Sequence, residues 1–268
     1  MTMNKNIFQK IDSNKAYILG FLWADGYVSK NMVGTEGSSK DFENLNKIIT
    51  KSGNWIVGHR ERFLKKTGKY YKQSYFHYYS KLTSDFLKCF DYDIKSHTEP
   101  IKILNYITPK YHYHFFRGYI DGDGSFSFYK GTNGTTMQCK FNITSSKEQN
   151  WNFIEKLFAT LEINHCLINR YDRKAGKSSI ISINNKWDII KLGEYLYIDS
   201  NDKLERKYNK YLQIKNSDVK KCANKWNIED TNFLIENYEK YGVEYCSEKL
   251  NRTVGSIYTQ YHRNKHKL

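Results

Sequence analysis

The sequence has few cysteines and no long apolar segment. Its five cysteines are widely spaced, odd in number and without a C-x-x-C pair, so we expect reduced thiols rather than zinc ligands or a disulfide framework. No apolar run approaches the roughly 18 residues of a membrane span, and residues 1–15 are too polar for a secretory signal peptide. These absences predict a protein of the cytoplasm or an organellar matrix that is neither secreted nor bound to a membrane.

Acidic residues are also scarce relative to basic ones. The chain has 28 Asp and Glu against 43 Lys and Arg, which gives a net charge of +15. Such an excess favours a polyanionic partner, and nucleic acid is the expected one because the membrane option is weak. The 268 residues suffice for one large domain or a few smaller ones, with ample buried core.

Two short segments of this basic chain nearly repeat each other. They are YILGFLWADG at 17–26 and FFRGYIDGDG at 115–124. Each is an apolar, helix-like run that ends in a small residue followed by Asp-Gly, so Asp25 and Asp123 occupy equivalent positions. A duplicated acidic helix end suggests two equivalent carboxylates that bind metal and act on a polyanion.

The pattern around the two segments repeats as well. In the first half we expect helices at 14–25, 42–49 and 82–90 and strands at 27–35, 55–63 and 70–79. In the second half we expect a helix from Thr108-Pro109 to Asp123, strands at 125–129 and 137–144, a helix at 148–161, strands at 166–171 and 178–183, and helices at 187–196 and 203–212. Ser13 is the expected N-cap of the first helix, and Gly26 and Gly124 are expected in the left-handed conformation that ends a helix. A repeat this long implies a pseudo-twofold domain.

Small residues recur inside the two apolar segments. In each copy a glycine precedes a small residue by four positions: Gly20 and Ala24, Gly118 and Gly122. Residues four apart share one face of a helix, so the two helices can pack closely through these residues. Asp25 and Asp123 would then emerge side by side at helix ends whose free carbonyls also attract cations. Such an oxygen-rich site suits Mg²⁺, which can activate water and stabilise a leaving oxygen at a phosphodiester.

Both segments resemble the LAGLIDADG motif, and residues 10–215 resemble a single-chain, two-motif LAGLIDADG homing endonuclease. The second motif is close to the family pattern, whereas the first is more diverged and has Trp23 in place of the usual first acidic residue. The resemblance implies that Asp25 and Asp123 bind two or more Mg²⁺ ions and that the carbonyls of Ala24 and Gly122 face the metals.

The same resemblance implies a fold and an activity. The fold would be α+β, with two pseudo-twofold-related αββαββα units with saddle-shaped antiparallel sheets at 1–105 and 106–215. The protein, intron-encoded or free-standing, would act as a monomeric pseudo-dimer on double-stranded DNA, with no protein partner. Its sheets would enter the major groove and its helix ends would reach the minor groove. Mg²⁺-dependent hydrolysis would then leave a staggered double-strand break with short 3′ overhangs in a long asymmetric site.

Family members also place basic or polar side chains beside the metals, where they order water and offset charge. By position, the candidates for this catalytic role are Lys95, Ser145, Gln149 and Arg206 or Lys207. His112 and His114 lie about two turns or more from Asp123 and lack a matching pair in the first half. We therefore expect these histidines to make packing or backbone contacts rather than to ligate metal.

Side chains of the two sheets are the expected DNA contacts, with phosphate contacts giving affinity and base contacts giving specificity. The candidates are Tyr70, Lys72, Gln73 and Tyr75 in the first half and Lys140, Asn142, Arg170, Arg173 and Lys177 in the second. The strand residues of the two halves differ, which fits an asymmetric site.

The pattern changes from about residue 215. Three short helices are expected at 228–241, 243–250 and 253–263, the last with Thr253 as its N-cap. The unit at 222–268 resembles a helix-turn-helix or Myb-like DNA-binding module. Its groove-facing candidates are Ser256, Thr259, His262 and Arg263. A purely structural cap is the alternative for this unit.

Two other functions are open for the whole chain: an RNA-binding intron maturase and a non-cleaving DNA-binding regulator on the same scaffold. The presence of both acids favours the nuclease, because binding alone has no need of paired carboxylates at helix ends. The helix-turn-helix-like tail favours DNA over RNA.

Overall fold

The computed structural model describes residues 5–64, 68–131, 137–145, 149–164, 166–173, 176–199, 202–217, 226 and 228–265. The chain divides into two compact units, residues 1–219 and 220–268. The first unit holds both duplicated segments, and the second holds the C-terminal helices. Within the described ranges, no helix combines the length and the apolar character needed to cross a membrane.

The first half of the larger unit is a four-stranded antiparallel sheet with associated helices. The strand order is β1-β2-β4-β3. The elements are α1 (Ser13–Asp25), β1 (Gly26–Val28), β2 (Met32–Ser38), α2 (Phe42–Ile49), β3 (Ile56–Leu64), β4 (Lys69–Tyr79) and α3 (Lys81–Lys88). Ser74 and Phe76 of β4 are fully buried, whereas their neighbours Gln73 and Tyr75 are not. One face of the sheet therefore covers the core and the other is open.

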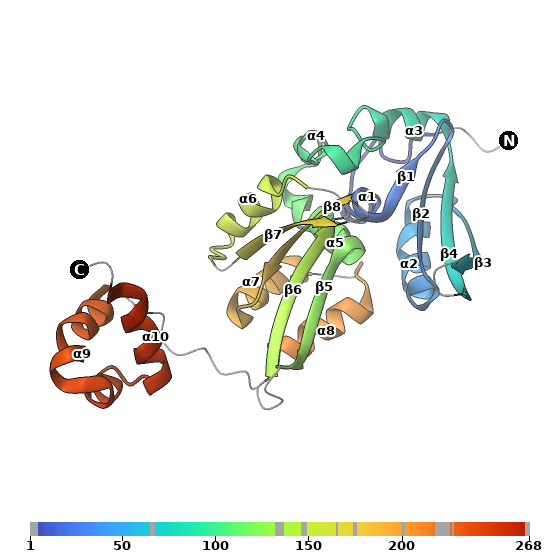
Figure 1. Cartoon of the computed structure of the whole chain (residues 1–268). Coiled ribbons are helices and arrows are strands. Elements are labelled where there is room, and N and C mark those ends of the chain that lie inside the picture. Colours follow the sequence, from blue (N-terminus) through green and yellow to red (C-terminus); the bar gives the residue numbers. More distant parts are fainter. Residues whose placement is uncertain are drawn as a thin grey trace. The chain divides into compact units, whose positions relative to one another are not determined.

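The second half repeats this plan. After α4 (Ile101–Tyr106) its elements are α5 (His112–Asp123), β5 (Gly124–Lys130), β6 (Met137–Ser145), α6 (Asn152–Thr160), β7 (Cys166–Arg173), β8 (Gly176–Ile183), α7 (Lys186–Leu196) and α8 (Glu205–Lys215). The strand order β5-β6-β8-β7 matches that of the first sheet. Helices α7 and α8 pack against β6 and β5 (Figure 1). The predicted α+β fold with two αββαββα repeats is therefore confirmed.

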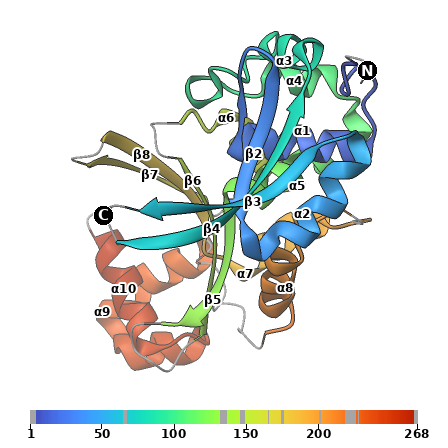
Figure 2. The same ribbon diagram turned by 90° about the vertical axis from the view of Figure 1, so that its right-hand side faces the viewer.

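Helices α1 and α5 pack against each other at the centre of the unit, between the two sheets (Figures 1 and 2). A Cβ on Gly20 would collide with the carbonyl of Phe115, and a Cβ on Gly118 would collide with the carbonyl of Tyr17. The two backbones are thus in contact through these glycines, as the four-residue spacing predicted. Residues 16–23 of α1 are all buried, which explains why this helix is apolar on every side.

Three local predictions around the motifs are wrong. Gly26 and Gly124 are extended, with φ of −83° and −81°, because the chain passes directly from each helix into a strand. Glycine is needed there for space, since a Cβ would lie about 2.5 Å from the Leu22 carbonyl in one copy and 2.6 Å from the Ile120 carbonyl in the other. The expected strand at 27–35 is two strands, β1 and β2, with a turn between them.

The starts of the two motif helices also differ from the prediction. Asp12, not Ser13, is the N-cap of α1 and accepts a hydrogen bond from the backbone N–H of Lys15. Thr108 makes no side-chain cap bond, and Pro109 begins a short 3₁₀ segment ahead of α5. Both helices still end at the predicted aspartates, Asp25 and Asp123.

The smaller unit is helical. Helix α9 (Ile228–Lys249) is interrupted at Gly242, whose φ is +84°, and α10 (Val254–Asn264) follows with Thr253 as its N-cap. The interruption falls at the predicted turn between the first two of the three expected helices, because only glycine adopts this left-handed conformation without strain. The core consists of Leu234, Cys246, Ile257 and Tyr261. Arg252 fixes the start of α10 through an ion pair of 2.7 Å with Asp230.

Candidate active site at the paired helix ends

A cavity of about 240 Å³ lies where α1 and α5 end. It is lined by Trp23, Ala24, Asp25, Lys95, Ser96, Tyr119, Asp123, Thr144, Ser145 and Gln149. The two halves both contribute to it, and six of the residues predicted for the site line it. Thr144 is exposed and alternates along β6 with the buried residues Phe141 and Ile143, so the cavity adjoins the open face of the second sheet.

The two motif aspartates interact electrostatically. Burial, together with the nearby charge of Asp25, raises the pKa of Asp123 to about 6. Burial also raises the pKa of Asp25. The ammonium groups of Lys95 and Lys207 act in the opposite direction on both carboxyl groups. Two partly desolvated carboxylates that oppose each other's ionisation are the arrangement that a divalent cation relieves.

Two lysines contact the helix ends in equivalent ways. Lys95, in a 3₁₀ turn of the first half, donates to the carbonyls of Trp23, at 2.6 Å, and Ala24. Lys207, on α8 of the second half, donates to the carbonyls of Asp121 and, at 2.9 Å, of Gly122. Trp23 and Ala24 stand two and one residues before Asp25, as Asp121 and Gly122 stand before Asp123, so the lysines are related by the pseudo-twofold symmetry of the fold.

Burial is the largest influence on the pKa of each of these lysines. It lowers the pKa of Lys95 to about 8 and lowers the pKa of Lys207 as well. The carboxylates of Asp25 and Asp123 oppose that effect in both cases. The site therefore holds two acids and two bases whose charges depend on one another.

Arg206 and Lys207, the two candidates from one segment, occupy different environments. Arg206 pairs with Asp41 through bonds of 3.1 and 2.8 Å from Nε and an Nη atom, and so links α8 to the first half. Only Lys207 reaches the end of a motif helix. The placement of Arg206 thus favours a structural role for it, and it favours Lys207 as the basic residue of the site.

The position of Asp121 was not singled out from the sequence as a site residue. Its carboxylate is buried and accepts hydrogen bonds of 2.8 Å from the Tyr17 hydroxyl and from the backbone N–H of Leu204. The segment that begins at Leu204 carries Lys207, so Asp121 holds that lysine in place. The signal for this role in the sequence is the first of the two aspartates in Asp121-Gly122-Asp123, which the first motif lacks.

In the first half, Trp23 takes the position of Asp121 and contacts the equivalent segment by packing. Its ring meets the Tyr92 ring edge-on with centroids 5.0 Å apart. The Tyr92 hydroxyl in turn donates to the carbonyl of Leu19 at 2.8 Å, and the segment that follows Tyr92 carries Lys95. An ionic anchor in one half therefore corresponds to an aromatic anchor in the other.

The remaining predicted polar residues lie at the edge of the cavity. Gln149 is buried, its backbone N–H donates to the Ser179 hydroxyl at 3.0 Å, and its side-chain amide donates to the Thr98 carbonyl at 3.4 Å. Ser145 ends β6 opposite Ser179 in the ladder. His112 and His114 make structural contacts, as expected: His112 Nε2 lies 2.9 Å from the Leu104 carbonyl, and His114 Nδ1 lies 2.6 Å from an Arg117 nitrogen.

The predicted DNA contacts divide between the two faces of the sheets. Residues of one strand alternate between faces. Gln73, Tyr75, Lys140 and Asn142 have the parity of the open faces. Four others have the parity of the core faces but lie toward the sheet ends, where their side chains are exposed: Tyr70, Lys72, Arg170 and Lys177. The side chain of Arg173 lies outside the described residues. In the smaller unit Thr259, His262 and Arg263 are exposed on α10, and Ser256 is half-buried.

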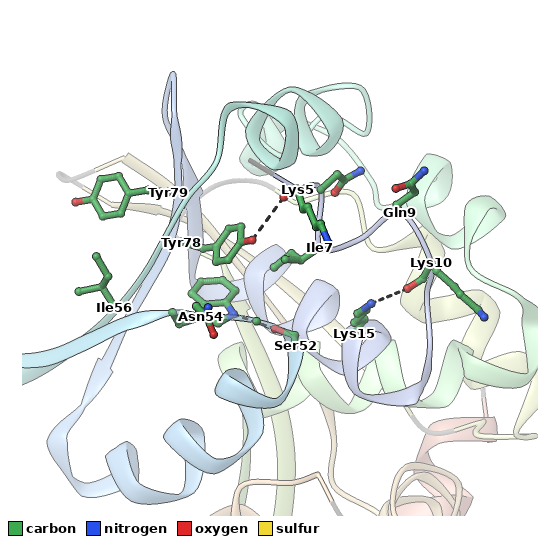
Figure 3. A pocket seen from close by; sticks show the side chains of 13 residues that line it. Lys5, Ile7, Gln9, Lys10, Lys15, Ser52, Asn54, Ile56, Tyr78 and Tyr79 are labelled. Atoms are coloured by element: carbon green, nitrogen blue, oxygen red, sulfur yellow. Dashed lines mark hydrogen bonds between the residues drawn. The ribbon is translucent and has the colours of Figure 1, made fainter. Parts of the chain in front are cut away.

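A larger cavity of about 800 Å³ lies elsewhere, between the N-terminal segment, the start of α1 and the start of β3 (Figure 3). Lys5, Lys10 and Lys15 line it, and no carboxylate does. Lys15 Nζ donates to the Lys10 carbonyl at 3.0 Å, a bond drawn as a dashed line in Figure 3. Without an acidic ligand this cavity is no alternative metal centre. Nor does any group of three or more His, Cys, Asp or Glu side chains gather elsewhere in the described part of the chain.

Comparison with known proteins agrees with the geometry. The model of the LAGLIDADG-like domain matches residues 111–226. No curated protein sequence matches the chain significantly. Among solved structures, the I-SmaMI LAGLIDADG homing endonuclease bound to cleaved DNA is 14% identical, with a TM-score of 0.50 over 94% of this chain and 96% of that chain.

A second solved structure, the homing endonuclease I-WcaI bound to its DNA recognition sequence, is 17% identical, with a TM-score of 0.48 over 78% of this chain and 88% of that chain. The family match covers the second repeat, and the strand order and the motif helix of that repeat recur in the first. Residues 111–226 therefore match the LAGLIDADG-like domain, and the larger unit has the fold of a single-chain form with two such repeats.

Proposed function

We propose that the protein is a site-specific DNA endonuclease of the homing type. The observation that carries this proposal is the cavity at the paired helix ends, where Asp25 and Asp123 meet and Lys95 and Lys207 contact the two helix termini. A protein that only binds DNA has no use for two desolvated carboxylates whose pKa values are raised by burial. The DNA complexes of structurally similar homing endonucleases support the same reading of the site.

The donor set fits a hard divalent cation, and Mg²⁺ is the expected ion. Asp25 and Asp123 would hold it, because their carboxylate oxygens are the ligands that Mg²⁺ prefers, with water completing the shell. The carbonyls of Ala24 and Gly122 accept hydrogen bonds from Lys95 and Lys207. That contact competes with the direct metal ligation we expected of them, so we assign the main ligand role to the carboxylates.

When bound, the ion would supply Lewis-acid stabilisation of charge at the scissile phosphodiester. The chain's own residues would do the rest. The two carboxylates, one from each half, are related by the pseudo-twofold axis, so each would act at the scissile phosphate of one DNA strand. The ammonium groups of Lys95 and Lys207 would stabilise the negative charge that develops on the phosphate and the leaving oxygen. Gln149 and Ser145, at the cavity edge, would orient water. We propose that the result is a staggered break with short 3′ overhangs.

The remainder of the larger unit would bind the duplex. The open faces of the two sheets carry different side chains, so each half would contact a different sequence in a long asymmetric site. The net charge of +15 supports affinity that falls steeply with salt. We further propose that the smaller unit binds DNA through α10, on which Thr259, His262 and Arg263 are exposed, and so lengthens the contacted site.

The test is incubation with plasmid DNA that carries the candidate insertion locus, in the presence of Mg²⁺ or EDTA. We expect a linear product with Mg²⁺ alone. The Asp123→Asn variant should lose double-strand cleavage while it retains binding to the same DNA. Mapping both cut ends checks the proposed 3′ overhangs. A product formed in EDTA, or undiminished cleavage by the variant, would overturn the assignment.

The two alternatives predict different outcomes. A non-cleaving regulator would bind DNA specifically and leave it intact with Mg²⁺. An RNA maturase would bind structured intron RNA in preference to the duplex. A binding and cleavage assay with labelled RNA and DNA in competition distinguishes the nuclease, the regulator and the maturase.

A further inference from the structure

The open face of the first sheet carries a cluster of aromatic rings close to the active site. Directly paired residues of a ladder share a face. Tyr27 pairs with Gly34, Gly34 with His77, and His77 with Ile56, across all four strands. Tyr27 stands two residues after Asp25, so this row of side chains begins at the candidate cleavage centre.

The rings contact one another. Tyr27 and His77 share a hydrogen bond of 2.6 Å between the hydroxyl and Nε2. The rings of Tyr75 and His77 are stacked with centroids 4.8 Å apart, and Tyr79 meets His77 edge-on at 6.3 Å. Burial lowers the pKa of His77, so the ring is neutral at physiological pH. The cluster is therefore uncharged and held in place from several sides.

Two glycines make room for these rings. A Cβ on Gly34 would lie 2.7 Å from the Tyr27 ring, and a Cβ on Gly58 would lie 2.6 Å from the Tyr75 hydroxyl. Both rings therefore lie across glycine positions of the neighbouring strand. The adjacent carboxylate on this face, Glu36, is ion-paired with Arg60. The face offers ring edges to a ligand here, together with Ile56, which is 55% exposed.

The second sheet has a different row at the equivalent place. Ser125 stands two residues after Asp123 and pairs with Asn142, Asn142 with Ser182, and Ser182 with Leu167. Leu167 corresponds to Ile56 and is also 55% exposed. Between the acid and this aliphatic residue, however, the first half has two rings and a glycine, whereas the second has Ser125, Asn142 and Ser182. Ser182 is buried and its hydroxyl donates to the Leu167 carbonyl at 3.5 Å, so the polar side chains on the surface here are those of Ser125 and Asn142. The two half-sites therefore meet surfaces of opposite character at the same distance from the centre.

Only one feature of the major groove is apolar, and it is the C5-methyl group of thymine. We infer that the cluster of Tyr27, Tyr75, His77 and Ile56 is a specificity element of the first half that recognises thymine by contact with its methyl group. The inference rests on the proposed function, since it names the base preference of that same DNA site. Ser125 and Asn142 of the second half would select by hydrogen bonds instead.

Removal of a single methyl group tests this inference directly. Selection of cleaved sequences from a randomised duplex library first defines the preferred site. Each thymine in that site is then replaced by deoxyuridine, which lacks only the methyl group, and binding is measured in EDTA. We expect at least one thymine in one half-site to lose about fourfold in affinity, which corresponds to ~0.8 kcal/mol for one buried methyl group.

Variants assign the effect to the cluster. Tyr75→Ala should abolish the deoxyuridine effect in that half-site, whereas the matched variant Asn142→Ala in the second sheet should leave it in place. If Tyr75→Ala fails to fold, His77→Asn provides the same comparison, and retained discrimination in the other half-site shows that a variant is folded.

Two negative outcomes are distinguishable. Absence of any sequence-specific binding or cleavage would remove the proposed function itself. Specific cleavage with deoxyuridine tolerated at every position, or a deoxyuridine effect that persists unchanged in Tyr75→Ala, would overturn this inference alone.

Discussion

At the scale of single residues, the acid pair couples protons to cations. Burial and the charge of Asp25 raise the pKa of Asp123 from its ordinary value of 3.8 to about 6. A carboxyl group whose pKa is raised on folding contributes stability that is fully present below pH 4. That contribution is lost as the pH rises through 6, because the charged form is then held in a desolvated site.

The consequence is a pH-dependent response to Mg²⁺. Without the ion, the two acids should cost the folded protein stability at pH 8 relative to pH 5. At a Mg²⁺ concentration about a hundredfold above the dissociation constant, on the order of 10 mM, we expect the free energy of unfolding to increase by about 2.7 kcal/mol at pH 8. At pH 5 we expect little increase. Thermal unfolding at both pH values, with and without Mg²⁺, measures this. Asp123→Asn should remove most of the Mg²⁺ effect, and an equal gain at both pH values would contradict the assignment.

Lys207 shows how one residue's role depends on its neighbour in the fold. Its ammonium contacts the end of α5, and its segment is held by the buried Asp121. The charge of Asp121 also raises the pKa of Lys207 against the effect of burial. Asp121 touches none of the atoms that would react, so we regard it as a positioning residue.

Asp121→Asn should therefore lower kcat by about tenfold or more, with KM for DNA nearly unchanged. Because the neighbouring charge is lost, the pKa of Lys207 falls, and the alkaline limb of the rate profile should move to lower pH. A purely structural role would lower the stability without moving that limb. Trp23→Phe is the matched control, since Trp23 occupies the equivalent position by packing alone and should leave the limb in place.

At the scale of elements, the contact between α1 and α5 depends on glycine. A Cβ on Gly20 would meet the backbone of Phe115 and Tyr119 rather than a side chain that can move aside. We expect Gly20→Ala to destabilise the protein by about 3 kcal/mol or more, at the upper end of the cost of overpacking. Gly255→Ala on α10, where no atom lies within 4 Å of the added Cβ, is the control. Urea unfolding followed by circular dichroism compares them, and equal stabilities would show that the helix pair can separate without cost.

The elements also show which parts of the fold can be predicted from the sequence. Helix α2 was predicted at its observed bounds because its apolar residues follow the helical period, and the motif helices were found because their pattern occurs twice. The sequence did not show which residues of β4 and β7 lie on the open face of each sheet. Tyr70, Lys72 and Arg170 are exposed at sheet ends on the core-side parity, so polarity alone did not tell them from the open-face residues Gln73 and Tyr75.

The part of the candidate site that can be predicted from the sequence is the part whose residues lie within one short motif. Asp25 and Asp123 follow from the motif, and Lys95 and Lys207, two of the candidates, contact the ends of the motif helices. The choice between Arg206 and Lys207 depends on a contact with Asp41, which is distant in the sequence. The anchoring by Asp121 depends on Leu204 in the same way. Such long-range pairings leave no local periodicity to read.

At the scale of the whole molecule, charge determines how the chain would find its site. A positive charge of this size gives non-specific binding that is dominated by released counterions, with a logarithmic salt slope of about −0.9 for each phosphate neutralised. Helix α10 of the smaller unit carries His262 and Arg263 in its last turn and no acidic residue. If α10 contacts DNA in the full chain, its cations must contribute to that slope.

Arg263→Ala should therefore weaken binding and reduce the salt slope by about one, while the cleavage position in the larger unit stays the same. Lys240→Ala removes the same charge from α9, where the ammonium lies 4.9 Å from the centre of the Tyr241 ring, and serves as the control. Fluorescence anisotropy over a series of salt concentrations gives both slopes. If the two substitutions change the slope equally, the effect is one of net charge and α10 has no specific contact. If only Arg263→Ala changes it, the smaller unit binds the backbone through α10, because a phosphate contact depends on where a charge lies as well as on its sign.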